Sequence, residues 1–114
     1  MNALGRHYLV ELWEADNLDR PDLVEEALVE TVRSTGGTLV DVRTVPFPNG
    51  GCSGVAIIAE SHISIHTWPE YGYAAVDLFT CSAKMDADAG LETLKKYFAP
   101  GRVQIAEVRR GILP

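Results

Sequence analysis

The sequence has no long hydrophobic run and no apolar segment at its start. Its longest uninterrupted apolar stretch, residues 55–59, is far shorter than the roughly 20 residues that a membrane-spanning helix needs. Residues 1–6 lack the apolar core of a secretory signal peptide. We therefore expect a cytoplasmic protein that does not enter a membrane.

Basic clusters are also missing, and cysteines are few. Ten basic against sixteen acidic side chains give a formal net charge of −6, and no basic run interrupts this balance. Nucleic acid is therefore not an expected partner. The two cysteines, Cys52 and Cys81, are expected to be free thiols in a reducing compartment.

The chain of 114 residues predicts a single domain, residues 1–114, with a buried core. Hydrophobic periodicity and turn residues predict the secondary structure. The expected strands are 6–14, 38–45, 55–60, 63–67, 73–80 and 102–109. The first expected helix starts within residues 19–22, with Pro21 in its first turn, and runs to about Thr35; the second has about 12 residues from Asp86 or Asp88. We predict a two-layer α+β sandwich in the order β-α-β-β-β-α-β, with one strand able to split. Its sheet is largely antiparallel, with both helices on one face.

Both faces of the central strands carry apolar side chains, as residues 55–59 and 74–79 illustrate. Two helices on one side can cover only one of these faces. We therefore predict that a second copy of the chain covers the other face, forming a homodimer through the sheet.

Residues 60–81 hold an unusual density of reactive groups for two short apolar strands. Because side chains alternate along a strand, Ser61 and His66 point to opposite faces and cannot meet along one regular strand. His62 and His66 have the spacing of a helical metal-ligand pair, but on a strand they lie roughly 13 Å apart. No metal site is predicted.

The same stretch resembles the signature of the prokaryotic S-adenosylmethionine decarboxylase proenzymes, which are pyruvoyl-dependent enzymes of polyamine synthesis. The resemblance rests on residues 60–62, 65–77 and 79–81, together with residues 8–12, Phe47, 51–54 and 108–112. It covers nearly the whole chain.

The resemblance implies that the chain cuts itself between Glu60 and Ser61. Ser61 Oγ would attack the Glu60 carbonyl, and elimination and hydrolysis would convert Ser61 into a pyruvoyl group. Residues 1–60 would become the β chain and residues 61–114 the α chain. The pyruvoyl group would form a Schiff base with the substrate amine and act as the electron sink. Other decarboxylases take this sink from pyridoxal phosphate, for which the sequence has neither a phosphate-binding glycine loop nor an evident Schiff-base lysine.

Roles for further residues follow from the resemblance. His66 would accept a proton during processing, with Ser53 assisting, and Cys81 would donate a proton to the product. The implied substrate-binding residues are Phe47, Glu70, Trp68, Ile63 and Ser64. Phe47 would stack on the adenine, Glu70 would accept hydrogen bonds from the ribose hydroxyls, and the other three would line or support the pocket.

The resemblance further implies a homodimer of processed protomers with shared sites. Ser61 and Cys81 would come from one chain, and Phe47, Ser53, His66 and Glu70 from the other. The expected reaction is decarboxylation of S-adenosylmethionine to the aminopropyl donor of spermidine synthesis. A pyruvoyl decarboxylase of arginine or ornithine with the same fold, an uncleaved non-catalytic subunit and a Cys–His hydrolase are the alternatives.

Overall fold

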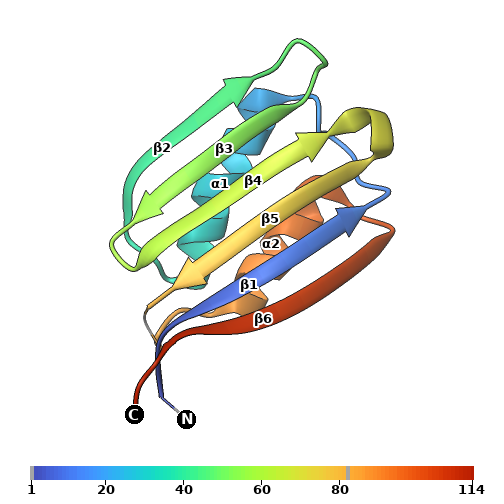
Figure 1. The fold of residues 1–114 in the computed structure, drawn as a ribbon. Coiled ribbons are helices and arrows are strands. Elements are labelled where there is room, and N and C mark those ends of the chain that lie inside the picture. Colours follow the sequence, from blue (N-terminus) through green and yellow to red (C-terminus); the bar gives the residue numbers. More distant parts are fainter. Residues whose placement is uncertain (1, 82) are drawn as a thin grey trace.

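The structure is a computed structural model that describes residues 2–81 and 83–114. One sheet and two helices form two layers, and both helices lie on the same side of the sheet (Figure 1). The elements are β1 (Ala3–Trp13), α1 (Pro21–Thr35), β2 (Leu39–Pro46), β3 (Cys52–Ile58), β4 (Ser61–Trp68), the 3₁₀ turn η1 (Pro69–Tyr71), β5 (Tyr73–Thr80), α2 (Ala87–Phe98) and β6 (Arg102–Ile112).

The sheet has the strand order β2-β3-β4-β5-β1-β6, and every neighbouring pair is antiparallel. This confirms the predicted α+β sandwich. The predicted order counted one strand too few, because the chain between the helices forms four strands rather than three. The extra strand arises where the two-residue turn at Ala59 and Glu60 separates β3 from β4, the split that the sequence had allowed.

Local sequence signals mark the start of both helices and the end of α1. Pro21 occupies the first turn of α1, where its missing N–H costs nothing, and Gly36 ends the helix with φ 82°. In that left-handed conformation, the N–H of Gly37 donates to the Val32 carbonyl at 3.0 Å. Asp86 caps α2 by accepting a hydrogen bond from the Ala89 N–H at 3.1 Å.

The core lies between the helices and one face of the sheet. Alternate residues of β3, β4 and β5 are buried there, as the strand period of two requires. Leu28 of α1 and Leu94 and Phe98 of α2 complete this layer and are almost fully buried. Gly54 of β3 allows α1 to pack closely, since a Cβ at this position would lie 2.7 Å from Leu28 Cδ1.

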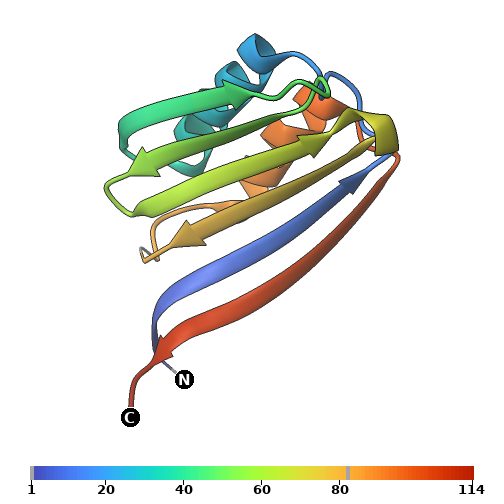
Figure 2. The same ribbon diagram turned by 45° about the horizontal axis from the view of Figure 1, so that its top comes forward.

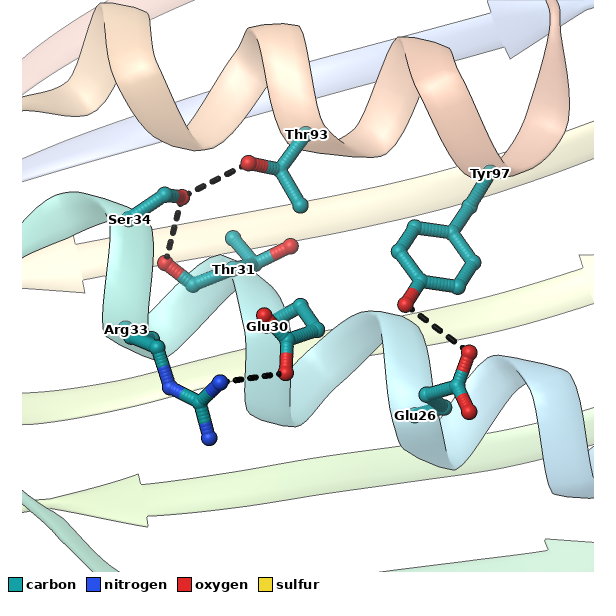
Figure 3. Close-up of polar contacts among 7 residues, drawn as sticks. All are labelled: Glu26, Glu30, Thr31, Arg33, Ser34, Thr93 and Tyr97. Atoms are coloured by element: carbon teal, nitrogen blue, oxygen red, sulfur yellow. Dashed lines mark hydrogen bonds and ion pairs between the residues drawn. The ribbon is translucent and has the colours of Figure 1, made fainter.

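The outer edge of the helix pair is joined by polar contacts (Figure 3). Thr93 donates to Ser34 Oγ at 2.8 Å, and the Tyr97 hydroxyl donates to Glu26 at 2.9 Å. Burial and the neighbouring Glu26 carboxylate raise the pKa of Tyr97 to about 12. Beneath these contacts, Gly90 of α2 faces Thr35 so closely that a Cβ would lie 2.6 Å from Thr35 Cγ2.

On the opposite face of the sheet, no helix is formed by the residues that the structure describes (Figure 2). Large apolar side chains are exposed on it, among them Ile57 at 48% and Trp68 at 38% of their surface. Polar pairs lie between them, since the Tyr73 hydroxyl donates to Glu11 at 2.7 Å and Ser64 donates to Asp77 at 3.0 Å. We call this surface the open face; what covers it in solution stays a prediction.

Four strands are longer than the sequence pattern predicts, and one of them, β4, extends beyond the expected 63–67 at both ends. β1 and β6 pair from Ala3 with Ile112 onward, so they extend past the end of β5 as a two-stranded ribbon (Figure 2). β3 begins at Cys52 because residues of the glycine-rich stretch pair with the end of β2. Among the described residues, no helix has the length and apolar content to cross a bilayer.

Candidate active site

The predicted site residues gather at two opposite ends of β4. One group lies at the turn between β3 and β4, which we call the cleavage end; it contains Glu60, Ser61 and Cys81. The other lies where β4 runs into η1, which we call the pocket end. Ser61 and His66 are five residues apart on one strand, about 17 Å by strand rise.

At the cleavage end, the Glu60–Ser61 peptide is both polarised and strained. The Glu60 carbonyl accepts a hydrogen bond from the Cys81 backbone N–H at 2.9 Å. Ser61 has φ 138°, a backbone conformation that glycine tolerates and other residues rarely adopt. Such strain costs about 1–3 kcal/mol and is characteristic of functional sites. A polarised carbonyl beside a strained serine suits attack by the serine hydroxyl.

Glu60 is fixed by Thr38, the residue before β2. Its carboxylate accepts from the Thr38 N–H at 2.9 Å and from the Thr38 hydroxyl at 3.3 Å. The backbone hydrogen bond from Thr38 lowers the pKa of Glu60. The Ala59 N–H donates to the Thr38 carbonyl at 2.9 Å, so both residues of the turn are anchored to the same neighbour.

At the pocket end, Ser53 and His66 are hydrogen-bonded partners. Ser53 Oγ and His66 Nδ1 are 2.7 Å apart, because the register of β3 and β4 pairs the two residues. A cavity of about 370 Å³ lies beside them. Its lining residues are Phe47, Pro48, Asn49, Cys52, Ser53, His66, Thr67 and Trp68.

Phe47 is about half exposed and Trp68 lies on the open face, so both present rings to this cavity. Glu70 lies in η1, and the Asn49 side-chain amide donates to its carboxylate at 3.1 Å. One cavity is thus lined by Ser53, His66, Phe47 and Trp68. Glu70 is tied to the same loop through Asn49.

Two residues predicted near the pocket lie elsewhere. Ile63 has no exposed surface and points into the core, so it can support a pocket only from below. Ser64 is on the open face between the two ends and donates to Asp77. Cys52 is fully buried, and burial raises the pKa of its thiol.

Several contacts of the site were not foreseen from the sequence. The sequence predicts Thr38 only as the first residue of the strand 38–45, and it predicts no role for Asn49. His7 Nε2 lies 3.3 Å from Asp77 Oδ1, without the alignment of a hydrogen bond, and the side chains are 19% and 32% exposed. These pairs join residues 21 to 70 positions apart, so no local pattern could have marked them.

Within residues 2–81 and 83–114, no group of three or more histidine, cysteine, aspartate or glutamate side chains is arranged to hold a metal ion.

Sequence and structure comparisons place the chain among known proteins. A family model described as S-adenosylmethionine decarboxylase matches residues 6–111. An S-adenosylmethionine decarboxylase proenzyme of Thermomicrobium roseum is 47% identical over 114 residues, covering 99% of this chain and 98% of the relative. A proenzyme of the same name from Methanococcus vannielii is 44% identical over 115 residues, covering 99% and 94%.

A crystal structure of the adenosylmethionine decarboxylase from Aquifex aeolicus superposes with a TM-score of 0.90 at 34% identity, covering 100% of this chain and 96% of that one. Fold and site together thus define an α+β sandwich of the adenosylmethionine decarboxylase type, with a strained serine between two strands. The protein belongs to the S-adenosylmethionine decarboxylase family.

Proposed function

We propose that this protein decarboxylates S-adenosylmethionine after cutting its own chain between Glu60 and Ser61. The observation that carries the proposal is the polarised, strained peptide at this bond: the Cys81 N–H bonds the Glu60 carbonyl while Ser61 is held at φ 138°. The relatives' name, proenzyme, supports the same view. Its product would serve as the aminopropyl donor for spermidine synthesis.

Self-cleavage begins with attack of Ser61 Oγ on the Glu60 carbonyl carbon. The oxygen of that carbonyl gains negative charge, and the Cys81 N–H is already in position to donate to it. A fixed backbone donor of this kind stabilises an oxyanion without reorganisation. Anchoring of Glu60 by Thr38 holds the carbonyl still while the bond forms.

The cleavage end suits a pyruvoyl group made from Ser61. The half-buried Ser61 pairs with Thr80, which brings the next residue, Cys81, beside the place where the group would form. When present, the pyruvoyl carbonyl supplies the sink for the electrons left by departing carbon dioxide. Cys81 would return a proton to the product carbon.

Substrate recognition falls to the pocket end. Phe47 and Trp68 offer aromatic surface for an adenine ring, and Glu70 offers carboxylate oxygens for ribose hydroxyls. Asn49 orients Glu70 through its 3.1 Å hydrogen bond. An adenosine-bearing substrate fits these groups better than arginine or ornithine, which carry no aromatic ring.

The separation of the two ends supports a homodimer with shared sites. Within one chain, Ser61 and His66 are roughly 17 Å apart, so the two ends cannot form one site. When two open faces meet, the cleavage end of one copy and the pocket end of the other can form a complete site. The exposed Ile57 and Trp68 would be covered by such pairing.

Intact-mass spectrometry of the purified protein tests this function. We expect two fragments, residues 1–60 and 61–114, the second with a blocked N-terminus, while Ser61→Ala remains one chain. Assays of the processed protein with S-adenosylmethionine, arginine and ornithine then establish the substrate. A wild-type chain that stays whole after long incubation would identify a non-catalytic subunit instead.

A further inference from the structure

We propose that His62 is the base that takes the proton from Ser61 Oγ in the first step of self-cleavage. The inference rests on the proposed function and names a catalytic residue for its opening step. His62 Nδ1 lies 3.2 Å from Ser61 Oγ. Of the three histidines in the chain, the described residues place only this one in contact with that hydroxyl.

The contact follows from the unusual backbone of Ser61. In a regular strand, neighbouring side chains point to opposite faces and do not meet. Ser61 instead has φ 138°, and its hydroxyl reaches the ring of the next residue. The strain at position 61 therefore has a second effect: it brings nucleophile and base together as well as exposing the bond to attack.

The imidazole of His62 is held in place by neighbouring rings. It stacks on Phe79 with centroids 5.6 Å apart at 28°, and the edge of His7 lies 6.4 Å away at 72°. Phe79 packs against Gly5, where a Cβ would lie 2.6 Å from its ring, and Arg110 covers it at 5.7 Å. The position of the base is therefore set by β1, β5 and β6 together.

The charged groups around this cluster contact residues other than His62. Asp77 of β5 lies against His7 of β1, and the His7 ring lies edge-on to His62. Arg110 of β6 lies over Phe79, and the Glu60 carboxylate is turned toward Thr38. Among the described contacts no cation pairs with the His62 ring, so the Nδ1 that faces Ser61 Oγ is not held by a competing charged partner.

The step balances without any co-reactant. The Ser61 O–H bond breaks and its proton passes to His62 Nδ1, while Oγ forms a bond to the Glu60 carbonyl carbon. The tetrahedral oxyanion is held by the Cys81 N–H. The C–N bond then breaks, and the proton on His62 moves to the Ser61 nitrogen, which leaves an ester and a free amine. His66, supplied by a second copy, is left with the later step, removal of the Cα proton that eliminates the ester.

The separate roles of His62 and His66 are tested with His62→Phe, which keeps the stacking on Phe79 and removes the base. Precursor made by cell-free synthesis is followed over time by mass spectrometry, with and without hydroxylamine, which cleaves an ester between residues 60 and 61. We expect His62→Phe to slow the appearance of the hydroxylamine-sensitive form by about 100-fold or more. In contrast, His66→Ala should accumulate that form.

A pH profile separates a base from a merely structural residue. The wild-type ester-forming rate should fall as pH drops through the imidazole range, and His62→Phe should lose this dependence. Added imidazole should restore part of the rate in His62→Ala. If circular dichroism shows that His62→Phe does not fold, His62→Gln replaces it in the same comparison.

Each outcome is decisive. Ester formation at the wild-type rate in folded His62→Phe or His62→Gln would overturn the inference and leave the proposed function intact. Accumulation of the ester in these variants would also overturn it, because His62 would then act after the acyl shift. A wild-type precursor that never forms the ester would overturn both proposals.

Discussion

At the scale of single residues, the two cysteines have opposite surroundings. Cys81 is exposed and its backbone N–H binds the Glu60 carbonyl, whereas Cys52 is fully buried and contacts Thr67. Burial raises the pKa of the Cys52 thiol, so it stays protonated and inert. Of the two cysteines, Cys81 is the one that lies at the cleavage end.

Cys81→Ala should therefore separate processing from turnover. The backbone N–H remains, so the chain should still be cleaved at residue 60, but kcat should fall by about 100-fold or more with loss of the proton donor. Intact mass measures the first effect and carbon dioxide release the second. Cys52→Ala is the matched control for loss of a thiol: it leaves the cleavage end unchanged, so its kcat should fall far less than that of Cys81→Ala, at some cost in stability. Unimpaired turnover by Cys81→Ala would remove it from its role.

At the scale of elements, the two helices approach closely through Gly90. Replacement by alanine improves helix propensity by up to about 1 kcal/mol. However, the new Cβ would lie 2.6 Å from Thr35 Cγ2 and 3.3 Å from Leu78 Cδ1, and such overpacking typically costs about 1–3 kcal/mol. Gly90→Ala should thus lower the free energy of unfolding in urea. Ala89→Gly on the same helix is a control for propensity alone; a more stable Gly90→Ala would contradict the packing.

The contact between Tyr97 of α2 and Glu26 of α1 (Figure 3) predicts a late tyrosine titration. Tyr97 and Tyr73 both have pKa values raised to about 12, so their hydroxyls should ionise well after an unperturbed tyrosine. A raised acid pKa gives stability that is present below pH 10 and is lost as pH rises through 12. Absorbance at 295 nm measures the titration, and Tyr97→Phe should remove one late step. A wild-type titration complete by pH 11 would contradict both contacts.

Most elements could be predicted from the sequence because their signals are local. Pro21 and Gly36 mark the ends of α1, and alternation marks β5. The strand order could not be predicted, because β1 pairs with both β5 and β6 through contacts more than 60 residues apart. For the same reason, the contacts of Thr38 and Asn49 with site residues could not be predicted, because their partners are distant in the sequence. The contact of His62 with Ser61 could not be predicted for another reason. It depends on the positive φ of Ser61, and a serine in a sequence does not indicate a positive φ.

At the scale of the whole molecule, the decisive feature is the open face. It carries apolar side chains such as Ile57 and Trp68 together with half-buried polar pairs, and its two ends hold the two halves of the predicted site. A face of this composition is suited to a protein partner. A second copy is the partner that would also complete the chemistry.

Complementation between two inactive variants tests the shared site. Cys81→Ala keeps a sound pocket end, and Glu70→Gln keeps a sound cleavage end. Random mixing by co-expression should restore about a quarter of wild-type activity, because half of the dimers are mixed and each has one of its two sites intact. Glu70→Gln mixed with Phe47→Ala is the control, since both defects lie at the pocket end. Recovery no greater than in this control would place the whole site within one chain.

The strand order has a consequence for a chain cut after Glu60. The first piece would hold β1, β2 and β3, and the second β4, β5 and β6, yet the sheet order β2-β3-β4-β5-β1-β6 interleaves them. The pieces meet at β3–β4, at β5–β1 and at β1–β6, and α1 of one packs on α2 of the other. Neither peptide contains the complete sheet or the complete core by itself. The cut would therefore create two new chain ends at the turn. The two peptides would remain parts of one folded unit and would separate only on unfolding.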